Sequence, residues 1–212
     1  MNRGNASIGD EATHLEVLDR KLQFEGAKWR LVTDDVRLLD GTVVRRDVVQ
    51  HPGAVGVLAL DNDDNVVLIQ QYRHPVATTL WEIPAGLLDE VGESPLNTAR
   101  RELFEEAHLR AQKWHLLLDL YSSPGMSSEV VRIYLARGLS DVPVDEQHQQ
   151  TDEEKDMPSV RVSLDQACEW VLAGRIHNSL AASALLAAVR ERDRGWAGLR
   201  DPETDWPTQP AR

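Results

Sequence analysis

The 212-residue sequence contains one cysteine, Cys168, so the chain cannot form a disulfide bridge within itself. This argues against a small disulfide-held secreted scaffold and favours a cytoplasmic protein. The sequence also lacks a long apolar run. The longest, from Leu180 to Val189, is interrupted by Ser183 and is far shorter than the ~20 residues of a membrane helix. The first 13 residues are polar and acidic, so we expect neither a signal peptide nor a membrane partner.

Positive charge is scarce. The chain has 23 Lys and Arg against 35 Asp and Glu, which gives a net charge of −12. A chain this acidic is not expected to attract nucleic acid or an anionic membrane. An anionic ligand would need a cation between itself and the protein. The length is sufficient for one domain, or one and a half, with a core that needs no disulfides.

Hydrophobic periodicity and turn residues predict a mixed α/β, or α+β, sandwich around a sheet. Strands are expected at residues 29–36, 42–49, 54–60, 66–72, 80–83, 114–121, 130–136 and 160–162. Asp40-Gly41 predicts a hairpin turn between the first two. Helices are expected at residues 95–108, from 164 to near 174, and from 179 to about 192, with Ser94, Ser163 and Asn178 as N-caps. Residues 140–158 are expected to be structureless, and the residues after 192 to form a loose tail.

The first of these helices carries an unusual group of carboxylates. At 100° per residue, Glu102, Glu105 and Glu106 lie together at the border of its buried face. Like charges three or four residues apart cost roughly 0.2–0.5 kcal/mol per pair, and the helix dipole does not favour them there. Such a cluster favours a hard-cation site for Mg²⁺ or Mn²⁺. The alternative is a solvated charged helix, with Arg101 paired to Glu105 and Glu106 to Arg110, which leaves Glu102 unexplained.

The stretch from Gly86 to Leu109 resembles the Nudix box. Glu93, seven residues and then Arg-Glu-Leu-Phe-Glu-Glu (residues 101–106) match the central part of that pattern. There are two departures. Gly86 stands one residue farther upstream of Glu93 than the standard pattern has it, as in actinobacterial-type ADP-ribose pyrophosphatases. His108 replaces the closing glycine, where a positive φ is expected.

The resemblance implies a Nudix-type α/β/α sandwich around a mixed sheet, with an added N-terminal antiparallel β region. On this basis we expect a disordered arm at 1–14, a β dimerisation region at 15–50, a Nudix hydrolase domain at 51–192 and a C-terminal tail at 193–212. In this family the N-terminal strands exchange across a dimer, so a homodimer is expected.

The resemblance also assigns roles to individual residues. The implied metal ligands are the Ala85 carbonyl, Glu102, Glu105 and Glu106, and the implied cofactor is Mg²⁺, with Mn²⁺ as a substitute. Glu93 pairs with Arg101 and, together with Gly86, is structural. The general base is expected on the acidic run 151–156, where Glu154 is favoured over Glu153. With Glu105 and Glu106, Glu154 completes the expected catalytic set.

Two features point to ADP-ribose as the substrate. The sequence Trp-Glu-Ile-Pro-Ala-Gly (residues 81–86), preceded by Gln-Tyr-Arg (71–73), is similar to the strand before the box in ADP-ribose pyrophosphatases. Pro124 lies 16 residues after the position of the closing glycine, the placement that marks this group; by itself its Ser-Pro-Gly context is simply a turn. The implied reaction gives AMP and ribose 5-phosphate. Expected substrate-binding residues are Trp29 (or a buried core tryptophan), Arg46, Arg73, Glu82, Pro124 and Glu129.

Three alternatives remain at this point. The same chemistry could act on another nucleotide sugar. A non-catalytic module could sense ADP-ribose, although such sensors commonly lose box glutamates and all four are present here. An isoprenoid diphosphate isomerase would need a catalytic cysteine in the site, whereas Cys168 lies on a predicted helix well past the box and is expected in the core.

Overall fold

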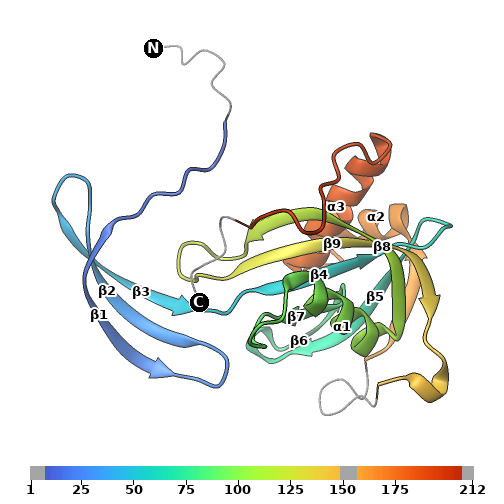
Figure 1. Cartoon of the computed structure of the whole chain (residues 1–212), viewed down its shortest axis with the longest axis horizontal. Helices are drawn as coiled ribbons and strands as arrows, with labels where there is room; N and C mark the ends of the chain where they lie inside the picture. Colours follow the sequence, from blue (N-terminus) through green and yellow to red (C-terminus); the bar gives the residue numbers. More distant parts are fainter. Residues whose placement is uncertain (1–7, 149–156, 207–212) are drawn as a thin grey trace. The chain divides into compact units, whose positions relative to one another are not determined.

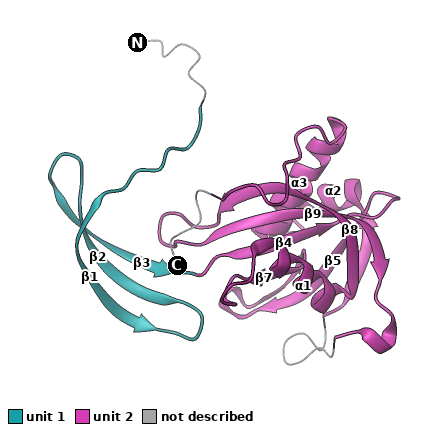
Figure 2. Ribbon diagram, viewed as in Figure 1, with its two compact units in different colours: residues 1–51 teal, residues 52–212 magenta. Residues whose placement is uncertain are grey.

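The computed structural model describes residues 8–148 and 157–206 (Figure 1). The chain forms two compact units, residues 1–51 and residues 52–212 (Figure 2). In the described parts of the chain, no helix combines the length and the apolar character needed to cross a membrane.

The smaller unit is a three-stranded antiparallel sheet of β1 (Glu16–Glu25), β2 (Arg30–Arg37) and β3 (Val43–Gln50), in the order β1-β2-β3. The predicted turn at Asp40-Gly41 joins β2 to β3. Gly41 has a φ of +86°, a value that favours glycine, and the Asp40 carboxylate accepts a hydrogen bond from the Thr42 amide at 2.9 Å. Local turn chemistry therefore sets this hairpin.

The larger unit is built on two sheets. One is mixed, in the order β7-β4-β9-β8, and the other is antiparallel, in the order β10-β5-β6. In the mixed sheet β4 and β9 run parallel, and the other neighbours are antiparallel. The strands are β4 (Ala54–Ala59), β5 (Asn65–Arg73), β6 (Thr78–Glu82), β7 (Ala85–Leu87), β8 (Leu109–Tyr121), β9 (Val130–Asp141) and β10 (Ser159–Ser163).

Helices cover both faces of the mixed sheet, as the burial pattern requires. Every residue of β4 is buried, and its side chains alternate between two cores. One core contains Leu58 and side chains of α2 (Leu164–Leu172) and α3 (Ser179–Asp193); the other contains Val57 and side chains of α1 (Pro95–Ala107). The α/β/α sandwich expected from the sequence is thus confirmed.

The predicted elements are present, but several boundaries differ. Two strands were not predicted individually: β1, where only a β region at 15–50 was expected, and β7, a strand of three residues that pairs with β4. Sequence analysis also made β8 and β9 too short. Because β9 extends to Asp141 and a 3₁₀ turn follows at Val144–Glu146, the expectation that residues 140–158 are structureless is wrong for its first part. Residues 149–156 lie outside the described structure.

The expected loose tail is also wrong for residues 199–206, which dock on the larger unit. Leu199 packs against a core, and Arg200 exchanges backbone hydrogen bonds with Leu116 of β8. Farther along, the carbonyls of Thr204 and Asp205 accept hydrogen bonds from the guanidinium of Arg132 at 2.7 and 3.3 Å. We call residues 199–206 the docked segment.

Candidate functional site

Helix α1 carries the candidate site, and its ends are set by local sequence. The Ser94 hydroxyl caps the N-terminus by accepting a hydrogen bond from the Asn97 amide, and Pro95 occupies the first helical position. At the C-terminus His108 adopts the left-handed conformation, with φ of 52°. The positive φ expected for the closing position of the box is therefore kept by a histidine.

Two carboxylates of α1 face the short strand β7. Glu106 and Glu102 are each only 8% exposed. Glu106 Oε2 accepts a hydrogen bond from the Ala85 amide at 2.8 Å. The carboxylate of Glu102 lies directly against Gly86, where a Cβ atom would be 1.9 Å from Glu102 Oε1. Glycine at position 86 is thus required by the close approach of a carboxylate, a cause that the sequence pattern does not reveal.

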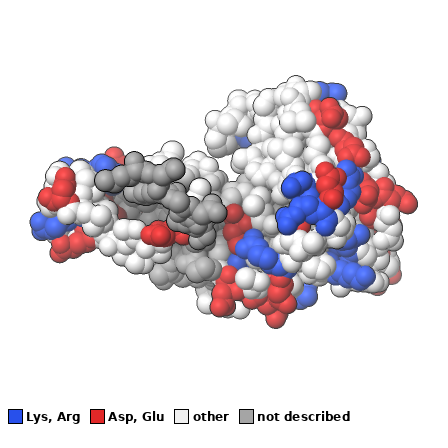
Figure 3. Space-filling model, turned by 90° about the horizontal axis from the view of Figure 1, so that it is seen from above, with Lys and Arg blue, Asp and Glu red and all other residues white. Residues whose placement is uncertain are grey.

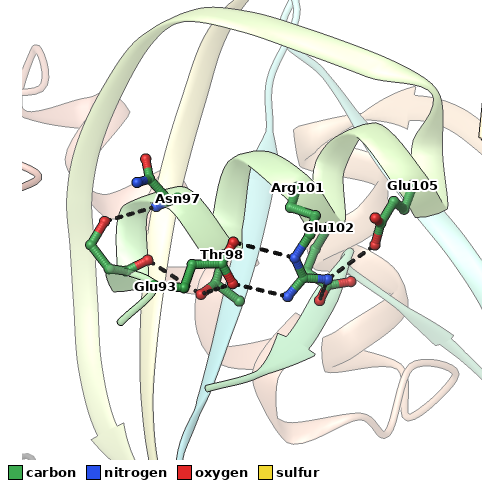
Figure 4. Close-up of polar contacts among 7 residues, drawn as sticks. Glu93, Asn97, Thr98, Arg101, Glu102 and Glu105 are labelled. Carbon is green, nitrogen blue, oxygen red and sulfur yellow. Dashed lines mark hydrogen bonds and ion pairs between the residues drawn. The ribbon is translucent and has the colours of Figure 1, made fainter. Parts of the chain in front are cut away.

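The guanidinium of Arg101 connects three acidic side chains of the box (Figure 4). Its Nε and Nη2 donate to Glu93 at 3.4 and 3.2 Å, which is the expected structural pair. Its Nη1 donates to both Glu102, at 2.7 Å, and Glu105, at 3.0 Å. Glu102, left unexplained by the charged-helix alternative, therefore has an ionic partner.

These contacts change the electrostatics of the box. The hydrogen bonds from Arg101, and a further one from buried Thr98, hold the pKa of Glu93 below its usual value. Burial alone lowers the pKa of Arg101, but hydrogen bonds to Glu93 and the charge of Glu102 outweigh it and raise that pKa. Arg101 is therefore a permanent cation beside the carboxylates. Arg110, the other cation of that alternative, pairs with Glu146 at 2.9 Å.

The residues around β7 fit a hard divalent cation by their chemistry. The carboxylates of Glu102 and Glu106 and the backbone at Ala85 offer oxygen donors of the kind that Mg²⁺ and Mn²⁺ prefer. Within residues 8–148 and 157–206, no three His, Cys, Asp or Glu side chains already stand in a metal-binding arrangement. In the conformation described, the guanidinium of Arg101 compensates the negative charge of Glu102 and Glu105.

Two expected substrate residues instead bind each other. Arg73, at the end of β5, donates to both oxygens of Glu82 at 2.9 and 2.7 Å. Glu82 is 2% exposed, whereas the side chain of Arg73 is 42% exposed. A buried carboxylate thus holds the guanidinium of a partly exposed side chain.

The remaining expected substrate residues lie in loops or in the smaller unit. Pro124 is exposed in the loop between β8 and β9, and Glu129 of the same loop accepts a hydrogen bond from the Ser122 hydroxyl. In the smaller unit Arg46 is exposed on β3. Trp29 is 44% exposed and packs on Phe24 with ring centroids 5.7 Å apart, so the buried-core alternative for it is wrong. Glu153 and Glu154 lie outside the described residues.

Cys168 is buried on α2, as expected, and burial raises the pKa of its thiol to about 11. It is therefore a protonated core residue at neutral pH, which removes the basis for the isomerase alternative.

One buried ionic group, centred on Arg132 of β9, was not predicted from the sequence. This side chain is 3% exposed, donates to both oxygens of Asp119 and lies 4.6 Å from the ring of Trp206. Trp206 thus anchors the docked segment. An arginine inside the apolar run Val-Val-Arg-Ile-Tyr-Leu-Ala was the available signal, since a buried charge requires a partner.

Comparisons with known proteins agree with this architecture. The model of the NUDIX domain matches residues 50–182. The chain is 43% identical over 195 residues to the ADP-ribose pyrophosphatase of Mycobacterium tuberculosis, covering 92% of each protein. It is 36% identical over 162 residues to the methanol dehydrogenase activator of Bacillus methanolicus, covering 76% of this chain and 85% of that protein.

Among solved structures, an ADP compounds hydrolase superposes with a TM-score of 0.69 at 23% identity. The match covers 89% of this chain and 99% of that one, which supports the fold. The resemblance seen in the box thus extends over both the sequence and the fold, and the chain belongs to the Nudix family.

Proposed function

We propose that this protein hydrolyses the diphosphate bond of ADP-ribose, giving AMP and ribose 5-phosphate. The observation that carries this proposal is the 43% identity, over 92% of each chain, to a protein named ADP-ribose pyrophosphatase. The box residues agree with it, because Arg101, Glu102, Glu105 and Glu106 lie on α1 and Glu93, just before the helix, pairs with Arg101.

Glu102, Glu106 and the Ala85 carbonyl would hold a divalent cation, Mg²⁺ in our proposal and Mn²⁺ as a substitute, with Glu105 beside them. When bound there, the cation supplies Lewis acidity to the diphosphate and makes water a better nucleophile. The protein's own part is to hold these carboxylates in place. Arg101 and the Ala85 amide do so through the hydrogen bonds described above.

The diphosphate also needs groups that orient it and a base that accepts a proton from water. Arg73 is suited to bind a phosphate or the terminal ribose, because Glu82 fixes its guanidinium while 42% of its side chain stays exposed. We retain Glu129 and Pro124 as neighbours of the substrate, and Trp29 and Arg46 as contributions of the smaller unit. Glu154 remains our prediction for the general base.

Release of AMP from a substrate panel tests this proposal. The panel holds ADP-ribose, NADH and diadenosine polyphosphates, with GDP-mannose and UDP-glucose followed by release of GMP and UMP. We expect metal-dependent turnover, with ADP-ribose well ahead of the others. Several substrates are included because a relative that is 36% identical to this chain has a different name, methanol dehydrogenase activator. A profile shifted to another sugar would favour the alternative substrate, and no turnover at all would favour a sensor.

We also propose that the protein is a homodimer formed through the smaller unit. Every residue of β1 is exposed within this chain, and Val17, Leu22 and Phe24 each expose 45–54% of their surface. Exposed apolar side chains on one sheet are typical of an interface. Sedimentation equilibrium should give twice the 23.8 kDa mass of one chain. A single-chain mass at micromolar concentration would contradict this expectation.

A further inference from the structure

A groove between α1 and β8 lies apart from the carboxylates of the candidate site. It has a volume of about 490 Å³ and is lined by Arg100, Arg101 and Arg110 together with the rings of Phe104 and Trp114. This volume lies within the ~300–1,000 Å³ range of ligand pockets.

The groove occupies the opposite side of α1 from the carboxylates. At 3.6 residues per turn, Arg100 and Phe104 each lie about 160° around the helix from Glu102. Arg100 and Phe104 therefore face away from Glu102, and the groove adjoins the carboxylates through Arg101, which also lines it.

Two guanidinium groups in this groove are held by aromatic rings. The guanidinium carbon of Arg100 lies 6.0 Å from the ring centre of Trp114, and that of Arg110 lies 5.6 Å from the ring centre of Phe104. Trp114 is itself fixed, because it is 8% exposed and its Nε1 donates to the Ala111 carbonyl. Cation–π contact with these rings restricts the arginine rotamers before any ligand binds.

The charges of the two guanidiniums are weakly compensated. Arg100 donates to the neutral side chain of Asn97 at 3.2 Å, and it forms no ion pair with the part of the chain that the structure describes. Arg110 pairs with Glu146, but both side chains are about half exposed. Displacing such a surface pair costs about 0–1 kcal/mol.

An anion is therefore the ligand that the groove favours, despite the net charge of −12. The net charge is not decisive, because acidic and basic side chains gather in separate adjoining patches on the face of the larger unit shown in Figure 3. Guanidinium groups bind phosphate oxygens through paired hydrogen bonds. Two of them, backed by apolar rings, match a phosphate group attached to an organic body.

We propose that this groove is a second ligand site that binds a phosphate monoester. AMP and ribose 5-phosphate, the products named above, both carry this group, and their choice as ligands rests on the proposed function. The groove would retain or sense the product at a position separate from the carboxylates of α1.

An NMR titration of AMP into the metal-free full chain tests the site directly. The probe is the indole N–H signal of Trp114, identified by its loss in Trp114→Phe. We expect AMP to shift this signal, and Arg100→Gln combined with Arg110→Gln to weaken the local affinity by about tenfold or more. Ribose 5-phosphate in place of AMP shows whether the phosphate alone is recognised.

A matched control removes the same charge elsewhere. Arg161→Gln combined with Arg190→Gln alters two exposed arginines distant in sequence from the groove and should change the affinity by less than about twofold. An equal loss in both double variants, or no shift of the Trp114 signal, would overturn the proposal.

The initial rate of ADP-ribose hydrolysis should be unchanged in the groove variant. If the protein hydrolyses ADP-ribose but AMP does not shift the Trp114 signal, the groove is rejected as a ligand site and the proposed function stands. A Trp114 shift in a protein that does not hydrolyse ADP-ribose would reject the proposed function and leave the groove as a phosphate site.

Discussion

Glu106→Gln should abolish most metal-dependent turnover and leave the fold intact. The amide retains an oxygen that can accept the hydrogen bond from the Ala85 amide, so packing between α1 and β7 is kept. It loses the negative charge that a cation needs. Losing several kcal/mol of charge stabilisation corresponds to a fall of about 10²–10³-fold in kcat/KM. Initial rates with ADP-ribose and Mg²⁺, together with a thermal unfolding curve, measure both properties.

Glu90→Gln is the matched control for that experiment. Glu90 is also a box-region glutamate, but it is exposed in the loop before α1. Its substitution should leave kcat/KM within about twofold and the unfolding temperature unchanged. Near-normal turnover of Glu106→Gln would remove Glu106 from the proposed ligands, whatever substrate the panel identifies.

The largest effect on stability is expected from Arg132→Leu. The substitution removes donors to both oxygens of Asp119 and to the carbonyls of Thr204 and Asp205. Removing one member of a buried ion pair costs about 3–5 kcal/mol. Asp119 keeps Arg200 as a partner and is 20% exposed, so we expect a loss near 3 kcal/mol in urea unfolding.

The same variant should release the docked segment, which gives a second measurement. With Arg132 gone, Trp206 and two backbone carbonyls lose their partner, and trypsin should cut after Arg200 faster than in the unaltered chain. Arg161→Leu is the control, because Arg161 pairs with Asp141 at the surface and should cost less than about 1 kcal/mol. Equal stability of the two variants would show that the Arg132 group does not hold the segment.

Most of the fold could be predicted from local signals. The turn at Asp40-Gly41 and the cap at Ser94 depend on a few neighbouring residues, and both are present. Strand β7 could not be predicted, because three residues are too few to show an alternation and the strand exists through its pairing with β4. The docked segment escaped prediction for a related reason, since its partners lie far away in the sequence.

The candidate site divides in the same way. Helical periodicity alone brings Glu102, Glu105 and Glu106 to one border of α1, so that cluster was visible in the sequence. The ion pairs of Arg101 with Glu93, Glu102 and Glu105 could be predicted only in part. The direction of the Arg101 side chain decides which of several nearby carboxylates it binds. The contact of Glu102 with Gly86 depends on tertiary packing and had no local signal.

The docked segment has a consequence for how the protein is made. Arg132 and Thr204 are 72 residues apart, so at ~5–20 residues per second a ribosome needs roughly 4–14 s to deliver the carbonyl that binds the guanidinium. The smaller unit pairs strands that are neighbours in sequence and can fold while synthesis continues. The larger unit must carry an incompletely paired charge during that interval. Docking of residues 199–206 on Arg132 is therefore a late step in biosynthesis. Before that step, the Arg132 side chain is the group that a chaperone would shield.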